Sequence, residues 1–318
     1  MNGRITTLSA LLALQLVVIA ALLAGVGVGG GVGGGGGAGG PVLTFEPSAV
    51  DTVRISGEGN AVALRRQGDG WILGNGQPAD DARVRDTLER LAALRGAWPV
   101  ATSADAGERF EVAPETHRRH LVLGAGDETV AELYLGTSPG YQQVHARPAG
   151  DTAIYSVELA NYQLPADPDV WLDATLLRPR GTITRVSRNG AWQLERDEAG
   201  WLLGEAAAAQ DAARGLVGHL KELRVNGMAD EPADGAAPVA QFDIADAEGT
   251  LTLSLYQDDS EEGAYRVASN RRDGHFSLAR HAAEALLLAR EDLEPPTGTD
   301  TAAESADETA EAAAAEAS

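Results

Sequence analysis

The stretch of this chain that most suggests catalysis is Gly-Thr-Ser-Pro-Gly at residues 136–140. This spacing fits the G-x-S-x-G nucleophile elbow of α/β-hydrolases, in which the backbone N–H of the residue after the serine contributes to the oxyanion hole. Pro139 follows the serine here, and proline has no backbone N–H. The elbow also leads into a helix, whereas residues 142–146 alternate as a strand does. The segment is therefore interpreted as a Pro-Gly hairpin turn between two strands.

Other motifs in the sequence give no cofactor or metal site. Residues 25–30 fit G-x-G-x-x-G, but they lie in a glycine run rather than between a strand and a helix, so nucleotide binding is not predicted. The pairs His117/His120 and His275/His281 lack the H-E-x-x-H helix context of metal ligands. The sequence contains no cysteine, which excludes thiolate ligands and disulfides. We therefore expect no metal and no cofactor.

Charged residues are abundant but do not indicate a catalytic pair. The 47 acidic residues are spread along the chain, so none can be assigned as general acid or general base. The chain is therefore predicted not to be an enzyme. The alternative is an envelope hydrolase or carbohydrate-processing enzyme that uses carboxylates the sequence does not single out. With only 25 basic residues the net charge is −22, and such a chain is repelled by phosphate backbones, so nucleic-acid binding is not expected.

One hairpin carries side chains that are suited to binding. After the Pro-Gly turn the chain has Tyr141, Gln142, His145 and Arg147, whereas the corresponding place in the second half is the acidic segment 257–263. Two copies of one scaffold that differ at a single hairpin indicate a specific role for that hairpin. These four residues are therefore a candidate interface. The alternative is that they serve only the local chemistry of the turn.

The N-terminus predicts a single-pass anchor in the inner membrane. Residues 8–28 have Ser9 and Gln15 as their only polar members, and as a helix rising about 1.5 Å per residue they span a bilayer core of about 30 Å. Arg4 marks the cytoplasmic side, which places residues 1–7 in the cytoplasm and the C-terminal part in the periplasm. The alternative is a cleaved signal peptide, although the apolar stretch of a signal peptide usually has only about 7–15 residues.

The segments that border the folded part have extreme compositions. Residues 25–40 contain 12 glycines in 16 positions, so residues 29–42 are predicted to be a flexible tether. Residues 295–318 contain six acidic residues and no basic ones, and they are predicted to be disordered. Residues 43–294 between them are enough for two modest domains.

The folded part contains an internal repeat at a shift of 130 residues. The shift places Ile183 on Val53 and Trp201 on Trp71 without a gap. In each copy the alternation of apolar and polar residues predicts a strand, a turn and a second strand that ends in tryptophan. The chain is therefore expected to build the same unit twice.

A helix is predicted after the strands of each copy. In the first copy one helical face carries Val84, Leu88, Leu91 and Leu94. Asp80 or Asp81 is the expected N-cap and Gly96 the expected stop. In the second copy the apolar face carries Leu216, Leu220 and Leu223. Asp211 lies near the expected start of that helix, and Asn-Gly at 226–227 marks its expected end.

Further strands follow each helix. The alternating segments are 121–123, 131–135 and 154–157 in the first copy, and 242–244, 251–255 and 275–278 in the second. A short helical connector, residues 169–177, is predicted between the copies. The predicted fold is α+β: two tandem repeats, residues 43–178 and 179–294, each about ββα followed by an antiparallel meander of three or four strands, with one helix on the sheet.

These features together resemble a known family. The segments that carry the resemblance are 50–55, 68–71, 135–141, 144–147 and 171–173. They are similar to the bacterial family of domain of unknown function 4340, and the likeness covers most of residues 43–293. The resemblance implies a membrane-anchored envelope protein that is encoded beside ABC-type transporter components and has no established catalytic residues. The expected function is a non-catalytic binding or accessory module of an ABC-type transporter complex.

Overall fold

The computed structural model describes residues 39–296 except 104, 234 and 258–263. The predicted anchor at residues 8–28, most of the predicted tether and nearly all of the predicted disordered tail therefore lie outside the described residues. Within the described part of the chain, no helix has the length and apolar character needed to cross a membrane. The last residues of the predicted tether form a short strand, β1 (Gly40–Pro41), which pairs with β5 (Arg95–Gly96).

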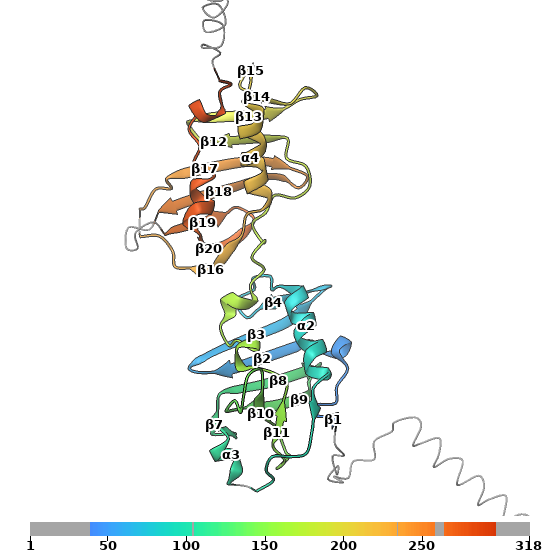
Figure 1. Cartoon of the computed structure of the whole chain (residues 1–318). Helices are drawn as coiled ribbons and strands as arrows, with labels where there is room; N and C mark the ends of the chain where they lie inside the picture. The colour runs from blue at the N-terminus through green and yellow to red at the C-terminus, as the bar shows by residue number, and fades with distance from the viewer. Residues whose placement is uncertain (1–38, 104, 234, 258–263, 297–318) are drawn as a thin grey trace, which may run out of the picture. The chain divides into compact units, whose positions relative to one another are not determined.

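Two antiparallel sheets contain most of the described strands (Figure 1). The first sheet has the order β11-β10-β9-β8-β2-β3-β4. Its strands are β2 (Thr52–Gly57), β3 (Asn60–Gln67), β4 (Gly70–Leu73), β8 (Arg119–Ala125), β9 (Glu128–Leu135), β10 (Val144–Pro148) and β11 (Tyr155–Val157).

The second sheet has the order β15-β14-β13-β12-β17-β18-β19-β20-β16. Its strands are β12 (Arg185–Arg188), β13 (Trp192–Arg196), β14 (Trp201–Leu203), β15 (Ala206–Ala207), β16 (Val225–Ala229), β17 (Ala240–Asp246), β18 (Gly249–Gln257), β19 (Tyr265–Ser269) and β20 (Arg272–Leu278).

The described residues also contain four α-helices and several short elements. The α-helices are α2 (Asp81–Ala92), α3 (Ala106–Arg109), α4 (Gln210–Lys221) and α5 (Arg280–Glu284). The short elements are the hairpin of β6 (Val112–Ala113) and β7 (Thr116–His117) and the 3-10 helices η1 (Pro47–Ala49), η2 (Asn161–Gln163), η3 (Pro168–Trp171) and η4 (Glu291–Leu293). The chain is mostly β-sheet with few helices, which confirms the predicted α+β class.

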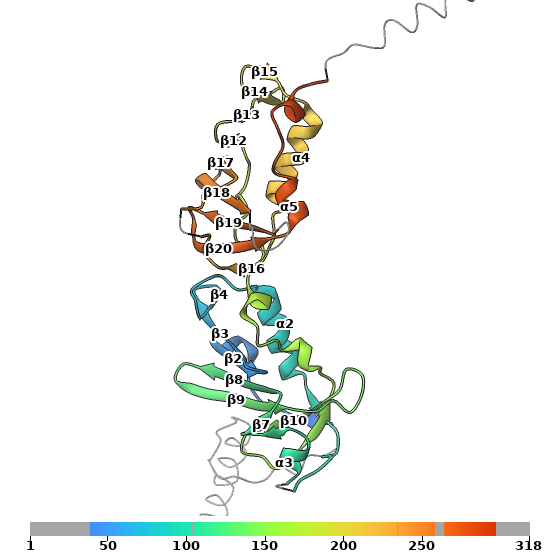
Figure 2. The same cartoon turned by 90° about the vertical axis from the view of Figure 1, so that its left-hand side faces the viewer.

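Helix α2 covers one face of the first sheet (Figure 2). Asp80 is its N-cap, because the carboxylate accepts a hydrogen bond from the backbone N–H of Arg83 at 3.0 Å. Val84, Leu88 and Leu91 are buried at helical spacing, as predicted. They meet the alternate, inward side chains of the strands, which are all buried: Val53, Ile55, Leu121, Leu123, Leu133 and Leu135.

Helix α4 covers one face of the second sheet in the same way, with α5 beside it (Figures 1 and 2). Leu216 and Leu220 are buried, as predicted, and Asp211 lies in the first turn. The first helical residue, Gln210, accepts a hydrogen bond from the backbone N–H of Trp201 at 2.9 Å and donates one to the Trp201 carbonyl at 2.8 Å. These bonds fix the start of α4 against β14.

The two glycine signals taken as helix stops were misread. Helix α2 ends at Ala92 and α4 at Lys221, whereas Gly96 lies in β5 and Gly227 in β16. A Cβ at Gly96 would lie 2.6 Å from the ring of Tyr155, and one at Gly227 would lie 2.5 Å from the Asp169 carboxylate. Glycine is required at both positions by close packing between elements rather than by helix termination.

The strand pattern predicted around Trp71 and Trp201 was also too simple. Trp71 belongs to a third short strand, β4, because the chain turns at Gly68, whose φ is +61°. Trp201 likewise belongs to β14 rather than to the end of β13. Three sheet strands, β2 to β4, therefore precede α2, and four, β12 to β15, precede α4, rather than two in each case.

The predicted helical connector is shorter than expected. Its helical part is only the 3-10 helix η3, because Leu172 is extended and forms a bridge with Ala79. The N–H of Asp80 donates to the Trp171 carbonyl at 2.8 Å, which holds the connector at the N-terminus of α2. The Trp171 ring is 1% exposed and its Nε1 donates to the Pro165 carbonyl at 2.8 Å.

Candidate functional site

The structure separates the four hairpin residues into two pairs. The prediction placed the tight turn at Pro139 and Gly140. In the structure the turn is centred on Tyr141 and Gln142, and the residues on either side of them, Gly140 and Gln143, form a backbone bridge. Gln142 has a φ of +52°, and the Tyr141 side chain is 88% exposed. The next residues form β10, so the segment does not lead into a helix as a nucleophile elbow does. Tyr141 and Gln142 are therefore available for contacts with other molecules.

His145 is held inside the fold. Its Nδ1 shares a hydrogen bond of 2.8 Å with the Thr137 hydroxyl, and its ring lies 4.4 Å from that of Phe110. Burial lowers the pKa of His145 below its ordinary value of 6.5. The lowered pKa favours the neutral imidazole. The ring links Thr137 at the base of the hairpin to Phe110.

Arg147 is half-buried and also supports the fold. Its Nε donates to the Val112 carbonyl at 2.7 Å, and one terminal nitrogen donates to the Asp151 carbonyl at 2.9 Å. The guanidinium lies 5.1 Å from the centre of the Tyr134 ring. Val112 and Tyr134 belong to a small second core with Ala106 and Ile154.

A groove lies along α2 and extends to the hairpin turn. It consists of two adjoining hollows of about 430 and 400 Å³, and Arg90 and Gln163 line both. One bank is α2 and the residues that follow it; the other is the loop 158–164 that contains η2. Gln142 lines the second hollow, so one of the four predicted interface residues belongs to this groove. We call it the α2 groove.

Buried side chains and internal hydrogen bonds fix both banks of the α2 groove. Leu91, Leu159 and Leu164 are buried and form its floor. The Gln163 side chain accepts a hydrogen bond from the backbone N–H of Ala160 at 2.9 Å, which closes the turn of η2. The Asn161 side chain donates to the Gly136 carbonyl at 2.9 Å and ties the loop to the base of the hairpin.

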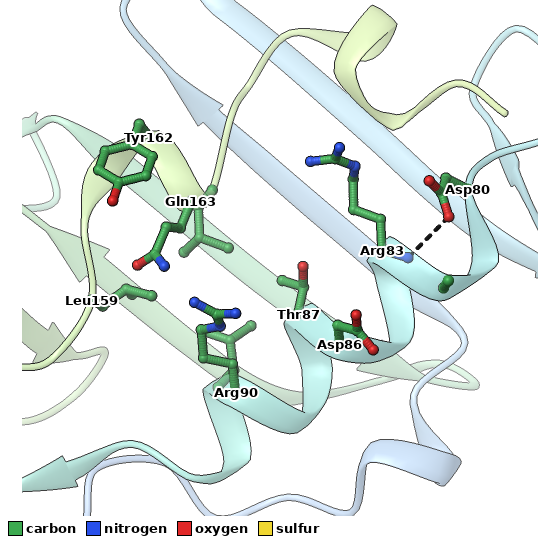
Figure 3. Close-up of a pocket in the computed structure, with 11 residues that line it drawn as sticks. Asp80, Arg83, Asp86, Thr87, Arg90, Leu159, Tyr162 and Gln163 are labelled. Atoms are coloured by element: carbon green, nitrogen blue, oxygen red, sulfur yellow. Dashed lines mark hydrogen bonds between the residues drawn. The ribbon is translucent and has the colours of Figure 1, made fainter. Parts of the chain in front are cut away.

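The α2 groove displays arginine and tyrosine side chains that are free to bind. Figure 3 shows Arg83 and Arg90 rising from α2 toward the loop that carries Tyr162 and Gln163. Both arginines are exposed, and neither guanidinium has an ion pair or hydrogen bond with a described residue. Tyr162 is 68% exposed, and Arg95 donates from its guanidinium to the carbonyls of Ala92 and Leu94. Arginine and tyrosine are the side chains most enriched in the energetic centres of protein interfaces.

The charge of the α2 groove is balanced. It is lined by three arginines and by three acidic residues, Asp80, Asp86 and Glu158, whereas the whole chain has a charge of −22. Asp80 is already engaged as the helix cap. A surface with both signs of charge, hydrogen-bonding amides and an exposed aromatic ring recognises a protein segment better than a polyanion.

The carboxyl groups with a shifted pKa all titrate below their ordinary range. A hydrogen bond from Arg119 lowers the pKa of Glu58, and one from His120 lowers that of Glu132. The pKa of Asp246 falls to about 2, chiefly through its hydrogen bonds with Arg271. A general acid needs a raised pKa instead, so these three groups are suited to ion pairing.

Three of the four histidines singled out in the sequence, His117, His120 and His275, contact other groups of the protein. The Nε2 atom of His120 lies 2.8 Å from the Glu132 carboxylate. The His120 ring also stacks on the Tyr134 ring, with 4.6 Å between the ring centres. His117 Nδ1 lies 3.2 Å from the Ala113 carbonyl, and His275 contacts the ring of Tyr256 edge-on. Within the described ranges, no group of three or more histidine, aspartate or glutamate side chains is arranged to hold a metal ion.

Sequence reasoning missed the residues of the α2 groove other than Gln142. The signal that could have found them is the spacing of Arg83 and Arg90, seven residues apart on the exposed face of an amphipathic helix. Tyr162 follows 72 residues after Arg90, so no local pattern could place it on the opposite bank.

Comparison with known proteins places the chain in a family without assigning an activity. No curated protein and no solved structure matches it. The family described as "Domain of unknown function (DUF4340)" matches residues 71–238, from β4 to the segment after β16. All residues of the α2 groove lie within this range, and β17 to β20 lie outside it. Because the match covers more than half of the 318 residues, the chain belongs to the DUF4340 family.

Proposed function

We propose that this protein is a non-catalytic binding module, anchored in the inner membrane by residues 8–28 and tethered in the periplasm by residues 29–42. Its proposed partner is a component of an ABC-type transporter complex. The apolar N-terminal segment supports the anchor, and the family membership supports the transporter association through the resemblance described above.

The α2 groove is the proposed docking surface, and it is the observation on which the proposal rests. Its floor is buried and its banks are fixed by hydrogen bonds, so little ordering is needed when a partner binds. Arg83, Arg90 and Tyr162 are exposed and have the composition of interface anchors. The proposed ligand is a polar segment of the partner protein that lies along α2 and reaches the hairpin turn at Gln142.

We also propose that the two halves are copies of one ancestral unit. From β4 to β11 and from β14 to β20 the strands follow each other in the same spatial order. In both halves the side chain of the first helical residue accepts a hydrogen bond from the backbone N–H of a tryptophan. Asp81 accepts from Trp71 at 2.7 Å, and Gln210 accepts from Trp201 at 2.9 Å. On this proposal, the partner-binding features were acquired by the first copy alone.

Substitution of the groove arginines tests the docking surface. The double variant Arg83→Gln, Arg90→Gln is expected to lose at least about 2 kcal/mol of binding free energy, roughly thirtyfold in affinity, because arginines at an interface centre carry much of the energy. The measurement is the amount of transporter component that co-purifies from crosslinked membranes of the native host.

The matched control removes the same charge elsewhere. Arg65→Gln with Arg85→Gln changes two exposed arginines that do not line the α2 groove, and capture is expected to be unchanged. Capture of the same amount by the groove variant and by the unmodified protein would refute the groove as the docking surface. Repeated recovery of the protein without any transporter component would refute the proposed partner.

A further inference from the structure

Another hollow, formed by elements that do not line the α2 groove, is lined by several arginine side chains. It has a volume of about 430 Å³ and is lined by Arg178, Arg180, Arg271 and Arg272, together with Glu248 and buried leucines. These arginines come from two segments about ninety residues apart in the sequence, the end of the connector and the turn between β19 and β20. Four of the 25 basic residues of a strongly acidic chain therefore meet in one place. We call this the arginine hollow.

Two of the four guanidiniums are held in place by the protein. Arg271 donates two hydrogen bonds to Asp246, at 2.7 and 2.8 Å, in a bidentate pair. Arg178 donates from Nε to the Leu223 carbonyl at 2.9 Å and from a terminal nitrogen to the Glu222 carbonyl at 3.3 Å. Their positions are thus set before any ligand arrives.

The segment that carries Arg180 is also fixed. Its backbone N–H donates to Asp246 at 2.7 Å, and its carbonyl accepts a hydrogen bond from the N–H of Ala247 at 3.0 Å. The next residue, Gly181, has a φ of +66°, and a Cβ there would lie 2.9 Å from the Cβ of Ala247. The glycine therefore lets this segment lie close against the turn between β17 and β18.

The arginine hollow has an excess of positive charge. Its four guanidiniums are opposed by Asp246, which pairs with Arg271, and by Glu248, which lies 3.7 Å from the same arginine. Arg180 and Arg272 have no ion pair or side-chain hydrogen bond with a described residue. The guanidiniums of Arg180 and Arg272 and the fixed guanidiniums of Arg178 and Arg271 all carry positive charge and repel one another. An anion bound among them would offset that repulsion.

We propose that the arginine hollow binds a phosphate group that carries more than one negative charge. A guanidinium presents several N–H donors in a planar fork that matches the oxygens of a phosphate, and several forks around one small hollow favour a compact anion with more than one charge. The group can belong to a soluble phosphate ester or to a lipid headgroup, since both present the same oxygens. The arginine hollow shares no lining residue with the α2 groove. The proposed phosphate site is therefore separate from the proposed docking surface.

Calorimetric titration of the full-length protein in a neutral detergent tests this site. The probes are inorganic pyrophosphate and dihexanoyl phosphatidic acid, which carry more than one negative charge. The comparison is dihexanoyl phosphatidylcholine, whose phosphodiester carries a single negative charge that the choline group balances. The unmodified protein is expected to bind at least one of the two phosphate probes saturably and the phosphatidylcholine not at all. Tighter binding of pyrophosphate would identify a soluble source, and tighter binding of phosphatidic acid a lipid source; both results support the site.

The variant Arg180→Gln, Arg272→Gln is expected to weaken binding of the phosphate probe about tenfold or more, because it removes two charge-assisted contacts and leaves the two fixed arginines in place. The matched control is Arg65→Gln, Arg85→Gln, which removes the same charge from exposed positions outside both the arginine hollow and the α2 groove and is expected to bind the probe like the unmodified protein. No saturable binding of either phosphate probe, no effect of the Arg180/Arg272 change, or an equal loss in the control would overturn the proposal. The Arg180/Arg272 variant is expected to capture the transporter component as the unmodified protein does. A loss of phosphate binding can therefore be distinguished from a failure of the proposed docking.

Discussion

Replacing Trp171 with alanine is expected to destabilise the protein by about 3–5 kcal/mol, the range typical of a buried tryptophan truncated to alanine. The side chain is 1% exposed and is among the largest of the fully buried side chains. Its removal leaves a cavity and also strips the Pro165 carbonyl of the hydrogen bond from Nε1. The free energy of unfolding, measured by urea titration followed by circular dichroism, gives the effect directly.

Trp98 is the control for this substitution. Its side chain is 70% exposed, so Trp98→Ala is expected to change the free energy of unfolding by less than about 1 kcal/mol. Trp171→Phe keeps a ring in the site and is expected to cost less than Trp171→Ala, which provides a measurement if the alanine variant does not fold. Equal effects at positions 98 and 171 would mean that the connector is not packed as described.

The second large effect is expected from Asp246→Asn. The Asp246 side chain has no exposed surface and accepts hydrogen bonds from both terminal nitrogens of Arg271 and from the backbone N–H groups of Arg180 and Glu248. Asparagine has one carbonyl oxygen and no charge, so Arg271 loses its bidentate, charged partner and keeps only the more distant Glu248 as an ion-pair partner. Because Arg271 itself is partly exposed, we expect a loss of about 2–4 kcal/mol at pH 5, slightly less than for a fully buried pair.

The cost of this substitution should depend on pH. Hydrogen bonds with Arg271 lower the pKa of Asp246 from its ordinary 3.8 to about 2 in the folded protein. Between these values the unfolded chain binds more protons than the folded one, so the stabilisation by the carboxylate is complete above about pH 4 and is lost as the pH falls through about 2. A shift of this size corresponds to about 2 kcal/mol.

Urea unfolding at pH 5 and at pH 2 checks this sign. The difference in unfolding free energy between the unmodified protein and Asp246→Asn is expected to narrow at the lower pH. Asp211→Asn is the control, since that carboxylate is exposed and its pairing with Arg214 should contribute less than about 1 kcal/mol. A gap at Asp246 that stays constant with pH would show that the carboxylate is not the source of the stability.

Much of the secondary structure could be predicted because it depends on short-range patterns. Buried Val84, Leu88 and Leu91 follow helical spacing, and the strands alternate, so the sequence alone indicates which residues face the core. Gly96 and Gly227 were misread because a glycine signals either a helix end or a close contact, and only the packed structure shows Tyr155 or Asp169 beside it.

The proposed binding surfaces could be predicted only in part, because they join distant segments. The hairpin sequence indicated Tyr141 and Gln142, of which Gln142 lines the α2 groove. It did not distinguish them from His145 and Arg147, which lie two residues apart on β10 and contact Phe110 and Tyr134. The second bank of the α2 groove and the two halves of the arginine hollow come from segments far apart in the chain, and no sequence spacing brings them together.

Site-specific photo-crosslinking from the α2 groove shows whether the groove contacts a transporter component in the cell. A photoreactive phenylalanine derivative in place of Tyr162 lies on the bank opposite Arg83 and Arg90, and one in place of Arg65 lies on β3, away from the groove. Irradiation of intact cells of the native host is predicted to give a discrete adduct with a transporter component from position 162, to give none from position 65, and to give none from position 162 when Arg83 and Arg90 are glutamine. Equal adducts from positions 65 and 162, or an adduct at 162 that survives the arginine changes, would contradict the account.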